Sequence, residues 1–174
     1  MGTPSARICW VVAQVDLRPL DHVLEVGCGH GVAISLLAER LPLGRVVAVD
    51  RSAAMVASAR RRNAALVDAG RVEVREGTFG ALGWTDPQFD HLVALDVADL
   101  ARSADRCLPE AARVLRAGGR LWWAMHDPPG ATGRPRGTDA LVEALPRHGF
   151  EVQRAAGVTL DDGTRMALVV ARRP

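Results

Sequence analysis

The sequence contains no lysine and no tyrosine, and its 22 basic residues are all arginines. Without lysine, Schiff-base chemistry is excluded, and so is a phosphate-binding loop that ends in Gly-Lys-Ser or Gly-Lys-Thr. Without tyrosine, no phenolic acid or base is available for catalysis. The formal net charge is only +2 and the arginines are spread along the chain. No strong positive field therefore indicates a nucleic-acid partner.

Cysteine is scarce and long apolar runs are missing. The three cysteines lie far apart, at Cys9, Cys28 and Cys107, and no pair has the spacing of a metal-binding or redox motif. We expect no metal site, and a reducing, cytoplasmic location is the simplest interpretation. The N-terminal apolar patch is short and broken by polar residues, unlike a signal peptide or a membrane span. The sequence predicts no membrane partner.

The 174 residues, 48% of them hydrophobic, are enough for one domain with a sizeable core and too few for two. Short runs rich in valine and leucine alternate with longer stretches of helical period, which favours a parallel sheet covered on both faces. The predicted strands are Val23–Gly27, Val46–Asp50, Val72–Glu76, His91–Leu95, Arg120–Met125, Phe150–Ala155 and Arg165–Ala171.

Capping residues and glycines mark the predicted helices. Ser52 caps a helix that runs through Asp68, and Ser103 opens one that ends at Gly118-Gly119. The other predicted helices run from Ser5 to about Leu17, from the glycine-rich loop to about Leu41, and from Thr138 to Gly149.

The last two predicted strands are separated only by residues 157–163, too few for a crossover helix. Asp161-Asp162-Gly163 favours a turn, so these strands should form a hairpin, with the final strand antiparallel to the rest. The predicted fold class is therefore α/β, a Rossmann-like, seven-stranded, mostly parallel sheet with helices on both faces. A loop rich in proline and glycine is expected from Asp127 to Gly137.

Three glycines follow the first predicted strand, in the stretch LEVGCGHG at residues 24–31. Glycine lets the chain turn sharply and lets a ligand lie against the backbone. The helix that follows offers free N–H groups to an anion. Nicotinamide-binding loops favour Gly-x-Gly-x-x-Gly, whereas the spacing here is Gly-x-Gly-x-Gly and position 32 is valine.

Two acidic residues accompany this loop. Glu25 lies near the end of a buried strand, where an unpaired carboxylate is costly, so we expect it to face a cationic or donor group of a ligand or the loop backbone. Asp50 ends the second strand, where a carboxylate can accept both hydroxyls of a ribose. A ligand with an amino acid end near Glu25 and a ribose at Asp50 matches S-adenosylmethionine.

With these features, nearly the whole chain resembles the class I S-adenosylmethionine-dependent methyltransferases, and specifically their small-molecule branch. The terminal hairpin is typical of that family and is absent from dinucleotide-binding folds. The segments similar to the family's successive motifs are Leu24–Gly31, Val49–Ser52 with Met55, Val74–Thr78, Phe89–Asp96 and Val114–Leu121.

The resemblance implies a set of site residues. Those it assigns to the cofactor are Glu25, Gly27, Cys28, Gly29, Gly31, Asp50, Arg51, Met55, Gly77, Thr78, Phe79 and Leu95. Within this set the three glycines of the loop would hold the methionine part and Asp50 the ribose. The adenine would border Arg51, Met55, Thr78 and Phe79. The family often has aspartate where this chain has Thr78.

Two residues near the expected methyl group are candidates for catalysis. Asp96, at the end of the fourth strand, could orient or deprotonate an acceptor, or could simply make a turn. His126, after the fifth strand, could be a general base, or could bond to the following loop. Because the sulfonium is already activated, methyl transfer mainly requires positioning, so we expect no strong catalytic motif.

The sequence thus predicts one domain over residues 1–174 that transfers a methyl group from S-adenosylmethionine to a small-molecule acceptor, leaving S-adenosylhomocysteine. The acceptor would be covered by the N-terminal helix, by the loop at residues 127–137, or by the second subunit of a homodimer. Two alternatives are a non-catalytic binding or assembly subunit with the same fold and a nicotinamide-dependent oxidoreductase.

Overall fold

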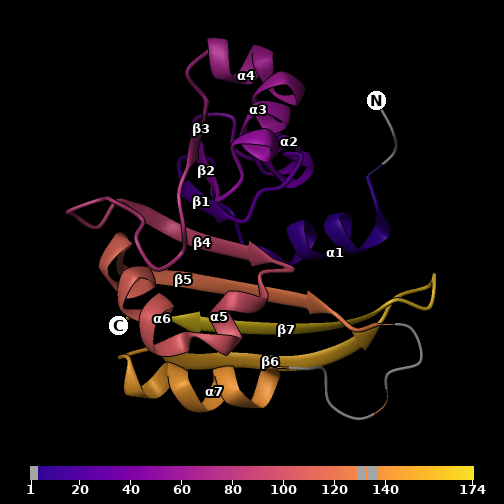
Figure 1. Cartoon of the computed structure of the whole chain (residues 1–174), viewed down its shortest axis with the longest axis vertical. Helices are drawn as coiled ribbons and strands as arrows, with labels where there is room; N and C mark the ends of the chain where they lie inside the picture. Colours follow the sequence, from indigo (N-terminus) through magenta and orange to yellow (C-terminus); the bar gives the residue numbers. More distant parts are fainter. Residues whose placement is uncertain (1–3, 129–131, 133–136) are drawn as a thin grey trace.

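The computed structural model describes residues 4–128, 132 and 137–174. Seven strands form one sheet in the order β3-β2-β1-β4-β5-β7-β6, which runs from top to bottom of Figure 1. β1 to β5 are mutually parallel, whereas β7 is antiparallel to β5 and β6. The predicted fold class is confirmed. The strands are β1 (His22–Val26), β2 (Arg45–Asp50), β3 (Val72–Glu76), β4 (Phe89–Leu95), β5 (Leu115–His126), β6 (Glu151–Thr159) and β7 (Arg165–Arg172).

Helices cover both faces of the sheet, and each face has its own apolar core. One group consists of α1 (Ala6–Gln14), α2 (Val32–Glu39), α3 (Ala53–Arg62) and α4 (Ala64–Asp68); the other consists of α5 (Ala98–Arg102), α6 (Ala104–Val114) and α7 (Thr138–Arg147). In β5, Trp122 is buried in the first core and Trp123 in the second. Neighbouring side chains in a strand point to opposite faces, so the two tryptophans pack in different cores.

The predicted hairpin joins β6 to β7. In its turn Leu160 donates its N–H to the Thr164 carbonyl, the Asp162 carboxylate accepts the N–H of Thr164, and Gly163 has a positive φ of +81°. β7 lies between β5 and β6 and is buried along almost its whole length, whereas β6 forms the edge of the sheet and is mostly exposed. The last strand of the chain thus lies inside the sheet.

The prediction of one helix from Ser52 to Asp68 is wrong. The structure has two helices there, α3 and α4, separated at Asn63. The backbone of Asn63 leaves helical geometry, with φ −107° and ψ 23°. Its buried side chain donates to the carbonyls of Gly31 and Ala59. This contact with the glycine-rich loop replaces continued helical geometry, and the periodicity of the sequence does not reveal it.

The predicted end of the next helix at Gly118-Gly119 is also wrong, because α6 ends at Val114. Leu115 already pairs with Phe89, and the register then shifts within the β4–β5 pairing. The two glycines lie in this irregular part of β5. A Cβ on Gly119 would come within 2.9 Å of the Arg116 carbonyl oxygen. These glycines therefore allow a bulge and do not end a helix.

Three smaller differences from the predicted elements remain. The short helix α5 was not predicted, and α1 ends at Gln14, before the expected Leu17. β6 continues to Thr159, beyond the predicted end at Ala155. Most of the loop predicted from Asp127 to Gly137 lies outside the described residues. No helix in the described part of the chain is long and apolar enough to span a bilayer.

Candidate active site

Two cavities lie at the carboxyl ends of the central strands. The strand order reverses between β1 and β4, which are neighbours in the sheet. β2 and β3 follow β1 on one side, and β5, β7 and β6 follow β4 on the other. Ligands of open α/β sheets bind where the strand order reverses in this way. The larger cavity has a volume of about 490 Å³ and the smaller about 240 Å³. Gly27 and Asp96 line both cavities and therefore mark their junction.

The three glycines of the loop at residues 27–31 all have positive φ, but their surroundings differ. Gly27 and Gly29 line the smaller cavity. A Cβ on Gly27 would come 2.5 Å from Cγ2 of Val97, whereas one on Gly29 would meet no atom within 4 Å. Gly31 lines neither cavity, and its Cβ would come 2.9 Å from Cβ of Ala59. Gly31 thus allows the loop before α2 to approach Ala59 of α3 closely.

Asp50 ties the end of β2 to the glycine-rich loop. Its Oδ2 accepts the N–H of Gly29 and its Oδ1 accepts the N–H of Ser52, each at 2.9 Å. The hydroxyl of Ser52 accepts the N–H of Met55, as an N-cap residue does. The Asp50 carboxylate lines the larger cavity. Each carboxylate oxygen can accept more than one hydrogen bond, so Asp50 can still bind hydroxyl groups of a ligand there.

Glu25 is a buried acid in the wall of the smaller cavity. The residue is 3% exposed, and its Oε2 has no hydrogen-bond partner among the described residues. Burial, and then the negative charge of Asp50, raises the pKa of Glu25 from 4.5 to about 8. An ionised carboxylate here requires a positive neighbour. A cationic group of a ligand would satisfy Oε2.

Arg7 is a cation at the same cavity that the sequence analysis did not identify. It lies on α1, and its buried Nε has no hydrogen-bond partner among residues 4–128, 132 and 137–174. Nε lies 3.6 Å from Oδ2 of Asp96. No motif surrounds Arg7, because its position depends on how α1 packs on the sheet. The smaller cavity therefore presents a carboxyl group and a guanidinium, which suits a zwitterionic ligand.

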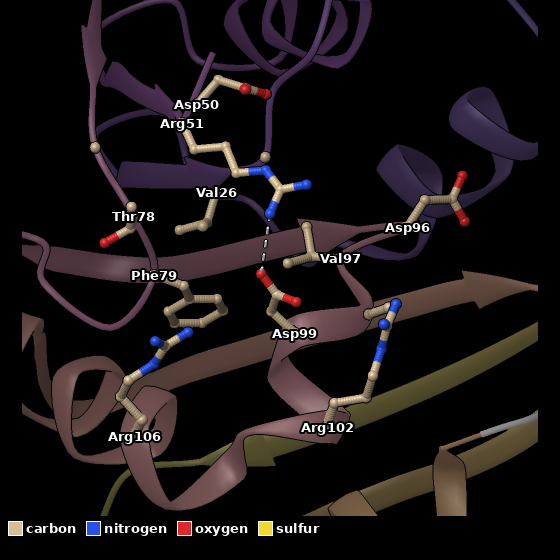
Figure 2. A pocket seen from close by; sticks show the side chains of 13 residues that line it. Val26, Asp50, Arg51, Thr78, Phe79, Asp96, Val97, Asp99, Arg102 and Arg106 are labelled. Carbon is tan, nitrogen blue, oxygen red and sulfur yellow. Dashed lines mark ion pairs between the residues drawn. The ribbon is translucent and has the colours of Figure 1, made fainter.

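The larger cavity opens between the loops that follow β2, β3 and β4. Figure 2 shows Arg51 and Asp99 reaching toward each other across it, and their charged atoms form an ion pair of 3.8 Å. Phe79 lies on one side of the cavity, and Gly77 and Thr78 continue that wall beyond β3. The cavity thus combines a carboxylate for hydroxyl groups, an aromatic wall and an ion pair across its opening.

Asp96 and His126 form a hydrogen-bonded pair. Oδ1 of Asp96 lies 2.7 Å from Nδ1 of His126 and also accepts the backbone N–H of His126 at 3.0 Å. Asp96 has a φ of +58°, and it is the one non-glycine residue with positive φ among those described. Such strained residues cluster at functional sites. Figure 2 shows the Asp96 side chain turned away from the larger cavity.

The structure does not bring every predicted residue to the cavities. Met55 lines neither of them, and His126 is connected to them through Asp96. Leu95 and Cys28 line the smaller cavity. Burial, together with the charges of Glu25 and Asp50, raises the pKa of the Cys28 thiol to about 12. Cys28 is therefore a neutral thiol, which agrees with a space-filling role.

A sequence profile described as "Methyltransferase domain" matches residues 23–119, a range that includes the glycine-rich loop, Asp50 and Asp96. The chain belongs to the class I S-adenosylmethionine-dependent methyltransferase family. The predicted resemblance is confirmed, and the cofactor of the family is S-adenosylmethionine. The match favours neither a nicotinamide-dependent enzyme nor a non-catalytic subunit.

A curated relative agrees with this membership, and solved structures share the fold. Over 111 residues this family member is 37% identical to demethylmenaquinone methyltransferase of Symbiobacterium thermophilum, covering 63% of this chain and 44% of that protein. Its fold is similar to the [4+2]-cyclase SpnF (TM-score 0.79, 20% identity, 97% of this chain and 80% of that one). It is also similar to geranyl diphosphate methyltransferase in complex with SAM (TM-score 0.77, 17% identity, 97% and 85%). Among curated relatives, the matched part of the chain spans about half of the relative's length, as it does for demethylmenaquinone methyltransferase.

Proposed function

We propose that this protein transfers a methyl group from S-adenosylmethionine to a small-molecule acceptor. The observation that carries the proposal is the pair of cavities that meet at Gly27 and Asp96. S-adenosylmethionine has an adenosine part and an amino acid part, joined at the sulfonium. Asp50 in the larger cavity suits the first part, and Glu25 with Arg7 in the smaller cavity suits the second.

Opposite charges in the smaller cavity would hold the amino acid part. The unpartnered Oε2 of Glu25 would accept the α-ammonium group, and Arg7 with the N–H groups of the glycine-rich loop would bind the α-carboxylate. A cation beside Glu25 favours its ionised form and so lowers its pKa below the value in the free protein. The buried acid thus becomes a binding group when the cofactor is present.

The walls of the larger cavity would hold the adenosine part. Asp50 would accept the ribose hydroxyls while keeping the loop in place through Gly29 and Ser52. The adenine would lie against Phe79 and Val97, which both line this cavity. Arg51 and Asp99 would close over it through their ion pair.

This arrangement leaves the sulfonium at the junction of the cavities, beside Asp96. In-line transfer needs the acceptor atom about 3 to 3.5 Å from the methyl carbon, and such positioning lowers a barrier by roughly 7 to 11 kcal/mol. The similarity to demethylmenaquinone methyltransferase supports a small-molecule acceptor. The cover over the acceptor, by α1, by residues 127–137 or by a second copy of the chain, remains a prediction.

A thermal-shift measurement with S-adenosylhomocysteine tests the cofactor site. A ligand that binds only the folded state stabilises it by about 2.7 kcal/mol at roughly 100 times its Kd, which for a chain of this length raises Tm by roughly 5 to 10 °C. NADH, the control, should leave Tm unchanged. A Tm that S-adenosylhomocysteine leaves unchanged, or that rises with NADH instead, contradicts the proposal. Binding without turnover of any acceptor would indicate the non-catalytic alternative.

A further inference from the structure

We propose that His126 is the general base of the methyl transfer, held in position by Asp96, and that the acceptor therefore carries a proton on the atom to be methylated. The inference rests on the proposed function and deepens it by naming the base and the class of acceptor. Alcohols, phenols and amines belong to this class. Carboxylates do not, because they have already lost their proton at neutral pH.

The hydrogen bond between the two residues decides which ring nitrogen can act as a base. An ionised carboxylate only accepts hydrogen bonds, so Nδ1 of His126, at 2.7 Å from Oδ1 of Asp96, carries the hydrogen in the neutral ring. Nε2 then holds the free lone pair. The side chain of His126 is 38% exposed, and Nε2 has no hydrogen-bond partner within the described ranges 4–128, 132 and 137–174. Nε2 is therefore free to take a proton.

The position of Asp96 relates this base to the reacting methyl group. Asp96 is one of the two residues that line both cavities, so a sulfonium that joins the ligand's two parts lies beside it. The backbone of Asp96 is tied to β5, because its N–H donates to the carbonyl of Ala124 at 2.8 Å. Its side chain is directed away from the larger cavity, as Figure 2 shows, and bonds to His126. The imidazole is thus hydrogen-bonded to a residue that lines both cavities, although it lines neither cavity itself.

One charged group contacts the pair, and two others lie close to it along the chain or the sheet. Arg7 of α1 lies 3.6 Å from Oδ2 of Asp96, which leaves Oδ1 to His126. Beyond the end of β5, Asp127 lies 3.6 Å from Arg165, the first residue of β7. The interactions recorded for the His126 ring within the described residues are with Asp96.

The chemical step transfers one proton to His126. The acceptor heteroatom attacks the methyl carbon as its bond to sulfur breaks, and that electron pair returns to sulfur to give the neutral thioether S-adenosylhomocysteine. The proton of the heteroatom moves to Nε2 of His126. The imidazolium that forms is stabilised by the Asp96 carboxylate and passes its proton to solvent from the exposed side of the ring. His126 is thus a catalytic residue and Asp96 a positioning residue.

Nitrogen-15 NMR of the protein saturated with S-adenosylhomocysteine tests the tautomer without knowledge of the acceptor. His126→Gln identifies the His126 resonances. We expect the neutral ring of His126 to carry its hydrogen on Nδ1, and Asp96→Asn to shift it toward Nε2. His91 is an internal reference of the opposite tautomer, because its Nδ1 accepts from Trp122 and its Nε2 bonds Asp21. A wild-type His126 protonated on Nε2 would overturn the proposal.

Turnover with catechol, benzylamine and benzoate, followed as S-adenosylhomocysteine formed, tests the class of acceptor. We expect product from the first two compounds and none from benzoate. His126→Gln should lower kcat by roughly 100-fold to 10,000-fold while its affinity for S-adenosylhomocysteine stays unchanged. Asp96→Asn should alter the pH profile of kcat with little change in KM. The kcat of the double variant should be no lower than that of His126→Gln.

His148→Gln is the matched control, because the imidazole of His148 bonds the exposed Asp105 and His148 lines neither cavity. It should leave turnover unchanged. Methylation of benzoate alone, or full turnover by His126→Gln, would overturn the inference. Neither result affects the proposed function, which is tested separately by the binding of S-adenosylhomocysteine and NADH and by turnover of any acceptor.

Discussion

Replacing Glu25 by glutamine should stabilise the free protein at neutral pH and weaken its binding of the cofactor. In the free protein, burial and the charge of Asp50 raise the pKa of Glu25 from 4.5 to about 8. Between these pH values the folded state keeps a proton that the unfolded state releases. The free energy of unfolding is therefore unaffected by Glu25 below about pH 4.5 and falls as the pH rises toward 8.

The size of the loss in stability follows from the width of this pH range, from 4.5 to about 8. Each pH unit within it costs about 1.4 kcal/mol, so at pH 7 the loss is roughly 3 kcal/mol. Glutamine has nearly the same shape as Glu25 and does not titrate. At pH 7 the Glu25→Gln variant should therefore melt roughly 6 to 12 °C above the wild type. At pH 4.5 the two proteins should have equal stability.

Urea unfolding between pH 4.5 and 8, followed by circular dichroism, measures this difference. Glu76→Gln is the control, because Glu76 is exposed at the end of β3, and its effect should stay below about 0.5 kcal/mol at every pH. Two results would refute the reasoning: a wild type whose stability does not change across this range, or a Glu25→Gln variant that is less stable than the wild type at pH 8.

The same substitution should lower the affinity for S-adenosylhomocysteine by roughly tenfold to a hundredfold, because a charge-assisted hydrogen bond of about 1.5 to 3 kcal/mol is lost. At pH 7 the wild type should release close to one proton on binding, since Glu25 ionises beside the ligand's ammonium group. Calorimetry in two buffers of different ionisation enthalpy measures this release. Equal release by both proteins would show that the proton comes from elsewhere.

Asp50→Ala should weaken S-adenosylhomocysteine binding by roughly tenfold to a hundredfold; unchanged affinity in calorimetry would remove Asp50 from the site. Gly31→Ala should lower the free energy of unfolding by roughly 2 to 4 kcal/mol in urea, because the new Cβ meets α3. Gly29→Ala, with open space around its Cβ, should cost only about 1 to 2 kcal/mol; equal costs would contradict the packing account. Iodoacetamide at pH 8 should label exposed Cys9 and spare buried Cys28, and rapid labelling of Cys28 in mass spectra would show that its thiol is accessible.

Features whose cause lies within a few residues could be predicted from the sequence. Buried parallel strands consist of continuous apolar runs, and the seven predicted strands are all present. The turn at Asp161-Asp162-Gly163 predicted the hairpin, and Ser52 caps α3 as expected. The glycine-rich loop was recognised because its spacing and its position after β1 are themselves local properties.

Features that depend on distant contacts could not be predicted in this way. The break between α3 and α4 arises because Asn63 bonds the carbonyl of Gly31. The glycines at Gly118-Gly119 resemble a helix end, but the pairing of β5 with β4 uses them in a bulge. In both cases the local sequence is compatible with two structures, and a contact with a distant segment determines which one forms.

The sequence by itself determined the fold class, the glycine-rich loop and the two acids, Glu25 and Asp50, that accompany it. Only the tertiary structure decided which charges meet. Packing of α1 brings Arg7 within 3.6 Å of Asp96, and the pairing of β4 with β5 brings Asp96 within 2.7 Å of His126. The physical reason is that a motif records spacing along the chain, whereas ion pairing and proton transfer depend on distances in space, which strand register and helix packing set.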